Sequence, residues 1–422
     1  MTAPTLPAEF ARMLADERSP LLHLPVFNPR IPSSDGADVA TGPRYAMPER
    51  CLWGTVPLCF LPPIVFGAYR LLLATFVLLG HLPHVTVRAA GNYSVFAFYL
   101  LSGYLMTLVL NETYGFSPRS IGRFLLNRAL RIYPPYFAAL VLAVACLWLR
   151  WWMHGTRIGP LDDPGIADWM SQILLVDVPG ARVARWIVPS WSLNVEVGYY
   201  VALVFLARRR SIVVIWTLLS LAVLARMLWT GGSFIERYFT YAAASLPFSL
   251  GSLLHHLRDV LPRASLGWGL VACGAYSINA TAGQYLWRDP TMEGFYLSLA
   301  LALIVVVLLR DPRVLAVGPR IRRLDARCGD LAYPLFLVHQ PITVAVAALL
   351  PLRLPGRQAW LAVGAIALSF LGAWLLHRLV EAPIARWRDR VRPAAPVGPA
   401  TALDAASRPP RDGQLLDRRA SS

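Results

Sequence analysis

Ten stretches of apolar residues follow one another along almost the whole chain. They occupy residues 62–82, 93–110, 133–151, 187–207, 211–228, 238–254, 266–283, 295–309, 331–350 and 358–379. Stretches of about this length can cross a bilayer as helices, because a helix satisfies its own backbone hydrogen bonds inside lipid. We therefore expect an all-α fold, a polytopic integral membrane helix bundle with about ten transmembrane helices, one for each stretch.

The composition agrees with this fold class and excludes others. Charged residues make up 15% of the chain, whereas a soluble domain usually has about a quarter. The 40 basic residues are all arginines and give a net charge of +16. They lie beside apolar stretches, which favours contact with lipid headgroups or a phosphorylated substrate over nucleic acid. The five cysteines form no CxxC pair, so we expect no metal site.

The arginines also indicate how the chain crosses the membrane. With a cytoplasmic N-terminus, the inner loops contain 15 arginines and the outer loops, among them 152–185 and 351–357, contain 7. Cytoplasmic loops usually carry the basic excess, so we expect a multi-pass protein of the plasma (inner) membrane with both termini cytoplasmic. The expected parts are a cytoplasmic N-terminal extension at 1–60, a membrane domain at 61–390 and a disordered cytoplasmic tail at 391–422.

Ionisable residues inside a membrane helix are costly and often functional. Arg70 and His81 lie eleven positions apart in the first stretch. This spacing puts both on one helix face, roughly 16 Å apart along the axis, with Arg70 at mid-depth and His81 near the outer surface. The alternative interpretation is a structural arginine that pairs with a buried carboxylate, together with an interfacial histidine.

Two more arginines, Arg128 and Arg131, precede the third stretch. A spacing of three places them on one face of a helix that enters the membrane. They are either an ordinary cytoplasmic flank or a cradle for phosphates, because guanidinium matches phosphate oxygens bidentately.

Three further ionisable residues lie in or beside apolar stretches. Glu196 has Tyr200 one helical turn further on, and its alternative role is a structural counter-ion to Arg70. His339 lies inside the ninth stretch, and Glu381 lies at the cytoplasmic end of the tenth.

Together these segments resemble acyltransferase family 3, the integral-membrane acyltransferases that O-acylate cell-surface carbohydrates and some small molecules. That family has an Arg-x10-His pair, an aromatic segment ending in SGF, an RxxR pair, a WSLxxE segment, a YxLYLxHxP segment and a closing ER-P. The corresponding segments here are Arg70 with His81, FYLLSGY with Ser102 and Tyr104, Arg128 with Arg131, Trp191 to Glu196, Tyr333 to Pro341, and Glu381 with Pro383. Phe96, Val197 and Ala382 stand where the family often has Asp, a second Glu and the closing Arg.

The resemblance implies an enzyme that transfers acyl groups other than aminoacyl groups. The expected donor is acyl-CoA, with acetyl-CoA foremost, and the expected acceptor is a hydroxyl of a carbohydrate or a related cell-envelope or small molecule. His81 is the candidate base, because a neutral imidazole can accept the hydroxyl proton. Arg70 stays protonated, so it would orient the donor or hold Glu196. Arg128 and Arg131 would bind the phosphates of coenzyme A.

The remaining candidates in these motifs are His339, Tyr200, Ser102 and Glu381. Acyl transfer directly to the acceptor and transfer through an acyl-enzyme both fit these residues. A transporter or flippase for a lipid-linked saccharide would also need many spans and buried charges, and a non-catalytic scaffold is a third alternative. The bilayer is an expected partner in every case, and the pattern names no oligomeric state.

Overall fold

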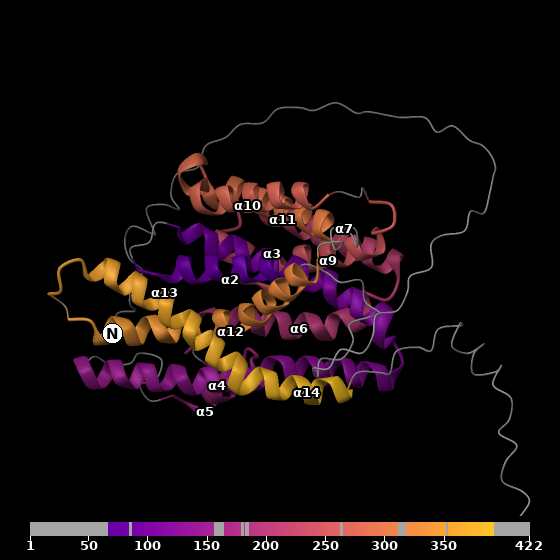
Figure 1. Cartoon of the computed structure of the whole chain (residues 1–422). Helices are drawn as coiled ribbons and strands as arrows, with labels where there is room; N and C mark the ends of the chain where they lie inside the picture. Colours follow the sequence, from indigo (N-terminus) through magenta and orange to yellow (C-terminus); the bar gives the residue numbers. More distant parts are fainter. Residues whose placement is uncertain are drawn as a thin grey trace, which may run out of the picture. The chain divides into compact units, whose positions relative to one another are not determined.

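The described part of the protein, in a computed structural model, is entirely helical. It comprises residues 66–83, 87–155, 164–178, 181, 185–261, 265–310, 318–351 and 353–391, and contains no strand. Figure 1 shows the long helices packed side by side. The expected all-α fold is confirmed, whereas the expectations for 1–60 and for most of 391–422 concern chain outside the described residues.

Within the described residues, each of the ten apolar stretches overlaps one helix of 15 residues or more. These helices are α2 (Gly67–His81), α3 (Arg88–Val109), α4 (Pro118–His154), α6 (Trp191–Leu206), α7 (Arg210–Trp229), α9 (Tyr241–His256), α10 (Leu266–Leu286), α11 (Phe295–Leu309), α12 (Pro319–Leu349) and α13 (Arg357–Leu376). The short elements are η1 (Leu110–Tyr114), α5 (Ile166–Leu174), η2 (Val188–Ser190), α8 (Phe234–Phe239), η3 (Pro290–Gly294), η5 (His377–Glu381) and α14 (Ala382–Val391).

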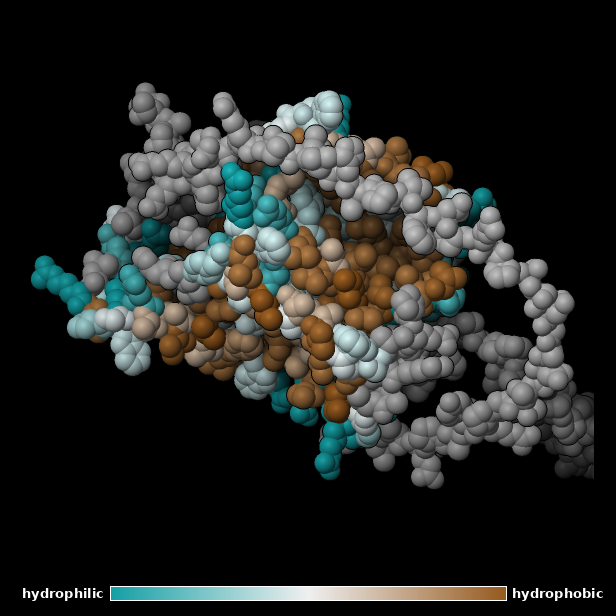
Figure 2. Space-filling view, turned by 90° about the horizontal axis from the view of Figure 1, so that it is seen from above, coloured by the Kyte–Doolittle hydropathy of each residue, from teal (hydrophilic) through white to brown (hydrophobic). Residues whose placement is uncertain are grey.

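Six helical segments of the described chain are long and apolar enough to cross a membrane. They are Ala89–Tyr114, Pro118–His154, Arg210–Trp229, Pro290–Leu309, Pro319–Leu349 and Arg357–Val391. The helix Gly67–His81 is apolar but shorter. Large apolar side chains are exposed on these helices, such as Leu218 and Leu219 of α7. Figure 2 shows hydrophobic residues over much of the described part of the face turned to the viewer. The chain is a polytopic helical membrane protein, and ten remains the predicted number of spans.

Two helices organise the packing around the site. Helix α3 packs against α2, α9 and α11, and helix α12 packs against α2, α4 and α13. Close approach of α3 and α9 depends on Gly103 and Gly251, because a Cβ on either would overlap the backbone of the other helix. Small residues at such crossings are typical of membrane helices.

The start of α2 is fixed to α12 by one carboxylate. Asp325 of α12 accepts hydrogen bonds from the backbone N–H groups of Gly67 and Ala68, at 3.0 and 2.8 Å. A carboxylate there satisfies two otherwise unpaired N–H groups and complements the helix dipole. A Cβ on Gly67 would overlap the backbone carbonyl of Asp325. This junction sets the position of Arg70, one turn further along α2.

The described part of the expected outer loop 152–185 runs back along α4. The Tyr136 hydroxyl donates to the Gln172 carbonyl at 2.6 Å, and the Tyr133 hydroxyl donates to that of Leu174 at 2.8 Å. Both tyrosines lie near the middle of the 37-residue helix α4. Helix α5 therefore lies beside α4 and not beyond its end (Figure 1).

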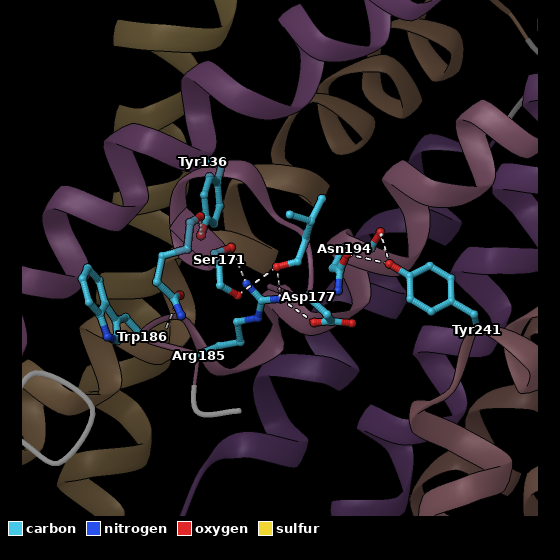
Figure 3. Close-up of polar contacts among 9 residues, drawn as sticks. Tyr136, Ser171, Asp177, Arg185, Trp186, Asn194 and Tyr241 are labelled. Carbon is cyan, nitrogen blue, oxygen red and sulfur yellow. Dashed lines mark hydrogen bonds and ion pairs between the residues drawn. The ribbon is translucent and has the colours of Figure 1, made fainter. Parts of the chain in front are cut away.

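A buried arginine holds the chain between α5 and α6. Arg185 donates to the Ser171 carbonyl at 2.6 Å and to the Asp177 carboxylate at 2.9 Å, as Figure 3 shows. In the same view, the Tyr241 hydroxyl of α9 donates to the side-chain oxygen of Asn194 at 2.6 Å. These contacts fix the beginning of α6, the helix that carries Glu196.

Candidate functional site: two cavities on one wall

The first cavity, which we name the arginine cavity, has a volume of about 380 Å³. Helices α2, α3, α4, α6, α12 and α14 contribute to it. Among the described residues, its ionisable lining consists of four arginines, one glutamate and three tyrosines: Arg70, Arg128, Arg131, Arg388, Glu196, Tyr99, Tyr200 and Tyr333. The excess of guanidinium groups over carboxylates gives this lining a net positive charge, which favours an anionic ligand.

The glutamate is held by neutral hydroxyl groups. Ser102 of α3 donates to a carboxylate oxygen of Glu196 at 2.7 Å, and Tyr200 donates to the same oxygen. None of the ion pairs among the described residues includes Arg70. The structural pairing of Arg70 with Glu196 is therefore not formed there, and both side chains border the cavity.

The two arginines of α4 border the same cavity, and aromatic rings and an amide orient them. The Arg131 guanidinium lies over the Tyr333 ring, 6.0 Å from its centroid. Arg128 donates to the side-chain oxygen of Asn127 at 2.7 Å and lies over the Phe124 ring at 5.9 Å. Such contacts fix a guanidinium in place without removing its charge.

His81 borders a second cavity, which we name the histidine cavity, with a volume of about 610 Å³. Although Arg70 and His81 share one helix, they line different cavities. His81 Nδ1 lies 2.7 Å from the Val77 carbonyl. A carbonyl only accepts, so we assign the hydrogen to Nδ1. In the neutral ring, Nε2 then keeps the lone pair that can accept a proton.

A second histidine lies between the two cavities. His339 of α12 is fully buried, and its ring centroid is 5.2 Å from that of His81. Its Nδ1 lies 3.1 Å from the Leu335 carbonyl, and among the described residues its Nε2 has no hydrogen-bond partner. Sequence spacing gave no reason to expect these two rings to meet, because they belong to the first and ninth stretches.

Helix α12 is a wall of both cavities. Phe336 lines the arginine cavity, and its ring centroid is 6.2 Å from that of His339. One turn beyond His339, Gln340 and Thr343 line the histidine cavity. On α12, His339 therefore lies between a residue of the arginine cavity and residues of the histidine cavity.

The last sequence candidate lies apart from these linings. Glu381 of η5 pairs with His377, with 3.2 Å between Nδ1 and the carboxylate. It is absent from the described linings of both cavities. Within the described residues, its partner is local to the turn after α13.

Two residues of the arginine cavity region were missed by the sequence interpretation. Arg388 lines the cavity from α14, and it was not among the candidate residues. Asn127 is fully buried and accepts hydrogen bonds from both Arg128 and Arg388. The signal for Arg388 was the alternation in RWRDR after the last span, which places neighbouring arginines on different helix faces.

Comparison with known proteins identifies the family. Searches among curated proteins and solved structures found no match. Residues 66–378 match the model of a family described as an acyltransferase domain. The matched range includes both histidines, Glu196 and three of the four cavity arginines, and leaves out Arg388. Because it covers well over half of the 422 residues, the chain belongs to acyltransferase family 3 and is a membrane acyltransferase.

Proposed function

We propose that this acyltransferase moves an acyl group, foremost acetyl, from acyl-CoA to a hydroxyl of a carbohydrate or related cell-envelope or small-molecule acceptor. The observation that carries the proposal is the arrangement of two cavities along α12, one rich in arginine and one bordered by His81. Two cavities along one helix would let the donor and the acceptor bind at the same time without occupying the same space.

The arginine cavity supports acyl-CoA as the donor. Coenzyme A carries a diphosphate bridge and a 3′-phosphate, and guanidinium groups bind phosphate oxygens with charge-assisted hydrogen bonds. Arg128 and Arg131 lie near the start of α4, which the predicted topology places on the cytoplasmic side, where acyl-CoA is made. The pantetheine arm would extend past Tyr333 and Phe336 toward the histidine pair.

The histidine cavity supports His81 as the general base. The acceptor oxygen attacks the thioester carbon, the C–S bond breaks, and the thiolate of coenzyme A leaves. Nε2 of His81 takes the hydroxyl proton and can return it to the leaving thiolate. The bond from Nδ1 to Val77 holds the ring in the tautomer that this step requires. The same lone pair would carry the acyl group if transfer used an acyl-enzyme.

Arg70 and Glu196 have supporting roles in this proposal. Arg70 keeps its charge and orients the donor from the arginine cavity. Glu196 fixes the hydroxyls of Ser102 and Tyr200 and offsets part of the arginine charge. Both would position the donor, since the proton transfer is assigned to His81.

The test is transfer from labelled acetyl-CoA by purified protein to a panel of hydroxyl-bearing acceptors, with products identified by mass spectrometry. We expect an O-acetylated product with wild-type protein and a large loss of product with His81→Ala. If folded wild-type protein transfers no acyl group but moves a lipid-linked saccharide across vesicles, the transporter interpretation replaces this proposal.

A further inference from the structure

Helix α14 presents one of its arginines to the arginine cavity and two to its surroundings. Arg386 and Arg390 are exposed, whereas Arg388 lines the cavity and is partly buried. Positions two apart on a helix lie about 200° round the axis from each other, so Arg388 occupies the face opposite to its two neighbours. The helix packs against α4, which brings Arg388 beside Arg128.

A single buried amide holds both of these arginines. Asn127 is fully buried on α4. Its side-chain oxygen accepts from Arg128 at 2.7 Å and from Arg388 at 3.5 Å, and its NH₂ group donates to the backbone carbonyl of Arg388 at 3.1 Å. The amide therefore fixes the backbone of α14 as well as the two side chains, and it does so without adding a negative charge.

The level of Arg388 in the cavity points to the nucleotide part of the donor. Arg388 and Arg128 meet at Asn127, one helical turn before Arg131 on α4. The histidine pair lies beyond Tyr333 and Phe336, toward the other end of the cavity lining. A donor with its thioester at the histidine pair has its phosphates at the arginine end.

We propose that Arg388 is a donor-binding residue that contacts a phosphate of coenzyme A, and that Asn127 is the residue that positions it together with Arg128. This inference rests on the proposed acyl-CoA donor. It assigns to α14, outside the matched family range, a part of the binding site. The helix lines the arginine cavity with Arg388, one of the four arginines there.

The experiment measures coenzyme A binding to the full-length protein by calorimetry, for wild type, Arg388→Ala and Arg386→Ala. Loss of a charge-assisted hydrogen bond should weaken binding roughly 10- to 100-fold in Arg388→Ala. Arg386 is an exposed arginine on the same helix, so its variant should stay within about twofold. Pantetheine, which has no phosphate, should bind all three proteins with equal affinity.

A comparison of coenzyme A with 3′-dephospho-coenzyme A identifies the phosphate. If Arg388→Ala removes the preference for coenzyme A over 3′-dephospho-coenzyme A, Arg388 binds the 3′-phosphate. If the affinities for both ligands fall equally, Arg388 binds the diphosphate. Unchanged coenzyme A affinity in Arg388→Ala, or an equal loss for pantetheine, overturns the inference while the donor assignment stands. A wild-type protein that binds no coenzyme A overturns both.

The positioning role of Asn127 has its own readout. Asn127→Ala should raise the KM for acyl-CoA several-fold and leave kcat close to wild type, whereas a folding defect would lower the active fraction and hence kcat. In the double variant with Arg388→Ala, the KM for acyl-CoA should rise by less than the product of the two single increases, because the two residues act through one contact. Independent effects, or a fall in kcat alone, would show that Asn127 does not position Arg388.

Discussion

The arginine cavity and the histidine cavity share the wall formed by α12 but differ in nearly every chemical respect. The first gathers four guanidinium groups and aromatic rings. The second is bordered by His81, Gln340 and Thr343 and has two arginines on its lining, one of which, Arg357, donates to carbonyls at the end of α12. The arginine cavity thus has four guanidinium groups on its lining and the histidine cavity two, so most of this fixed positive charge lies away from His81. A guanidinium next to His81 would disfavour the protonated imidazole that forms during transfer.

The comparison depends first on the two cavities opening to opposite sides of the membrane. In otherwise cysteine-free protein, Arg320→Cys should react only with reagent on the cytoplasmic side, and Arg353→Cys only with reagent outside. The expected effect is all-or-none, because an impermeant reagent does not cross the bilayer. Labelling of both positions from one side would break the assignment of donor and acceptor sides.

The next largest effect is expected at the histidine cavity. His81→Ala should lower kcat by about 10²- to 10⁴-fold, the usual contribution of a general base. Coenzyme A affinity should stay at the wild-type value, because His81 lies outside the lining of the arginine cavity. Steady-state kinetics and calorimetry on the same preparation measure both quantities.

His256→Ala is the matched control for that variant. Its ring lies 3.1 Å from the Ala207 carbonyl, and it borders neither cavity among the described linings. We expect it to retain most of the wild-type kcat. A His81→Ala protein with wild-type turnover would contradict the base assignment, and one that loses coenzyme A affinity would contradict the separation of the cavities.

The reverse pattern is expected at the arginine cavity. Changing Arg128 and Arg131 together to Ala should weaken coenzyme A binding by about 3 kcal/mol or more, since charge-assisted hydrogen bonds contribute about 1.5–3 kcal/mol each. The pair Arg119→Ala and Arg123→Ala, earlier on the same helix and outside the described lining, is the control. Equal losses in the two double variants would show a general electrostatic effect and no specific cradle.

The smallest effect is expected at Gln340, which sharpens the assignment of the acceptor side. Its side-chain carbonyl is buried and has no hydrogen-bond partner among the described residues, and the residue lines the histidine cavity. If this oxygen accepts a hydrogen bond from the hydroxyl substrate, Gln340→Met should raise the KM for that substrate. The increase should correspond to about 0.5–1.5 kcal/mol of lost binding free energy. The KM for acyl-CoA should not change, and a rise in that KM instead would assign Gln340 to the donor.

Much of the fold could be predicted from the sequence, because apolar length and the need for internal hydrogen bonds leave a membrane segment little choice but a helix. The same reasoning did not predict helix α5 or its place beside α4. That segment is tied to α4 by hydrogen bonds from Tyr133 and Tyr136 to backbone carbonyls. Such bonds depend on which helix faces which loop, and apolar periodicity carries no information about that.

The candidate site could also be predicted only in part. Motif order brought together Arg70, Arg128, Arg131 and Glu196, which the structure places around one cavity. Motif order did not predict that Arg70 and His81 would border different cavities. The two residues share a helix face but lie roughly 16 Å apart along the axis, and spacing does not show where one cavity ends and another begins. Nor could spacing along the chain place Arg388, since the face of α14 that meets α4 is decided by Asn127.

The carboxylate of Asp325 at the start of α2 has a consequence for how substrates come and go. It ties α2 to α12 at a crossing so tight that Gly67 has no room for a Cβ. Because these two helices carry His81 and His339, the junction that holds α2 against α12 also sets the spacing of the two imidazoles. Substrate exchange that moved α2 away from α12 would break both backbone hydrogen bonds to Asp325, so we expect reactants to enter and leave without separating these two helices.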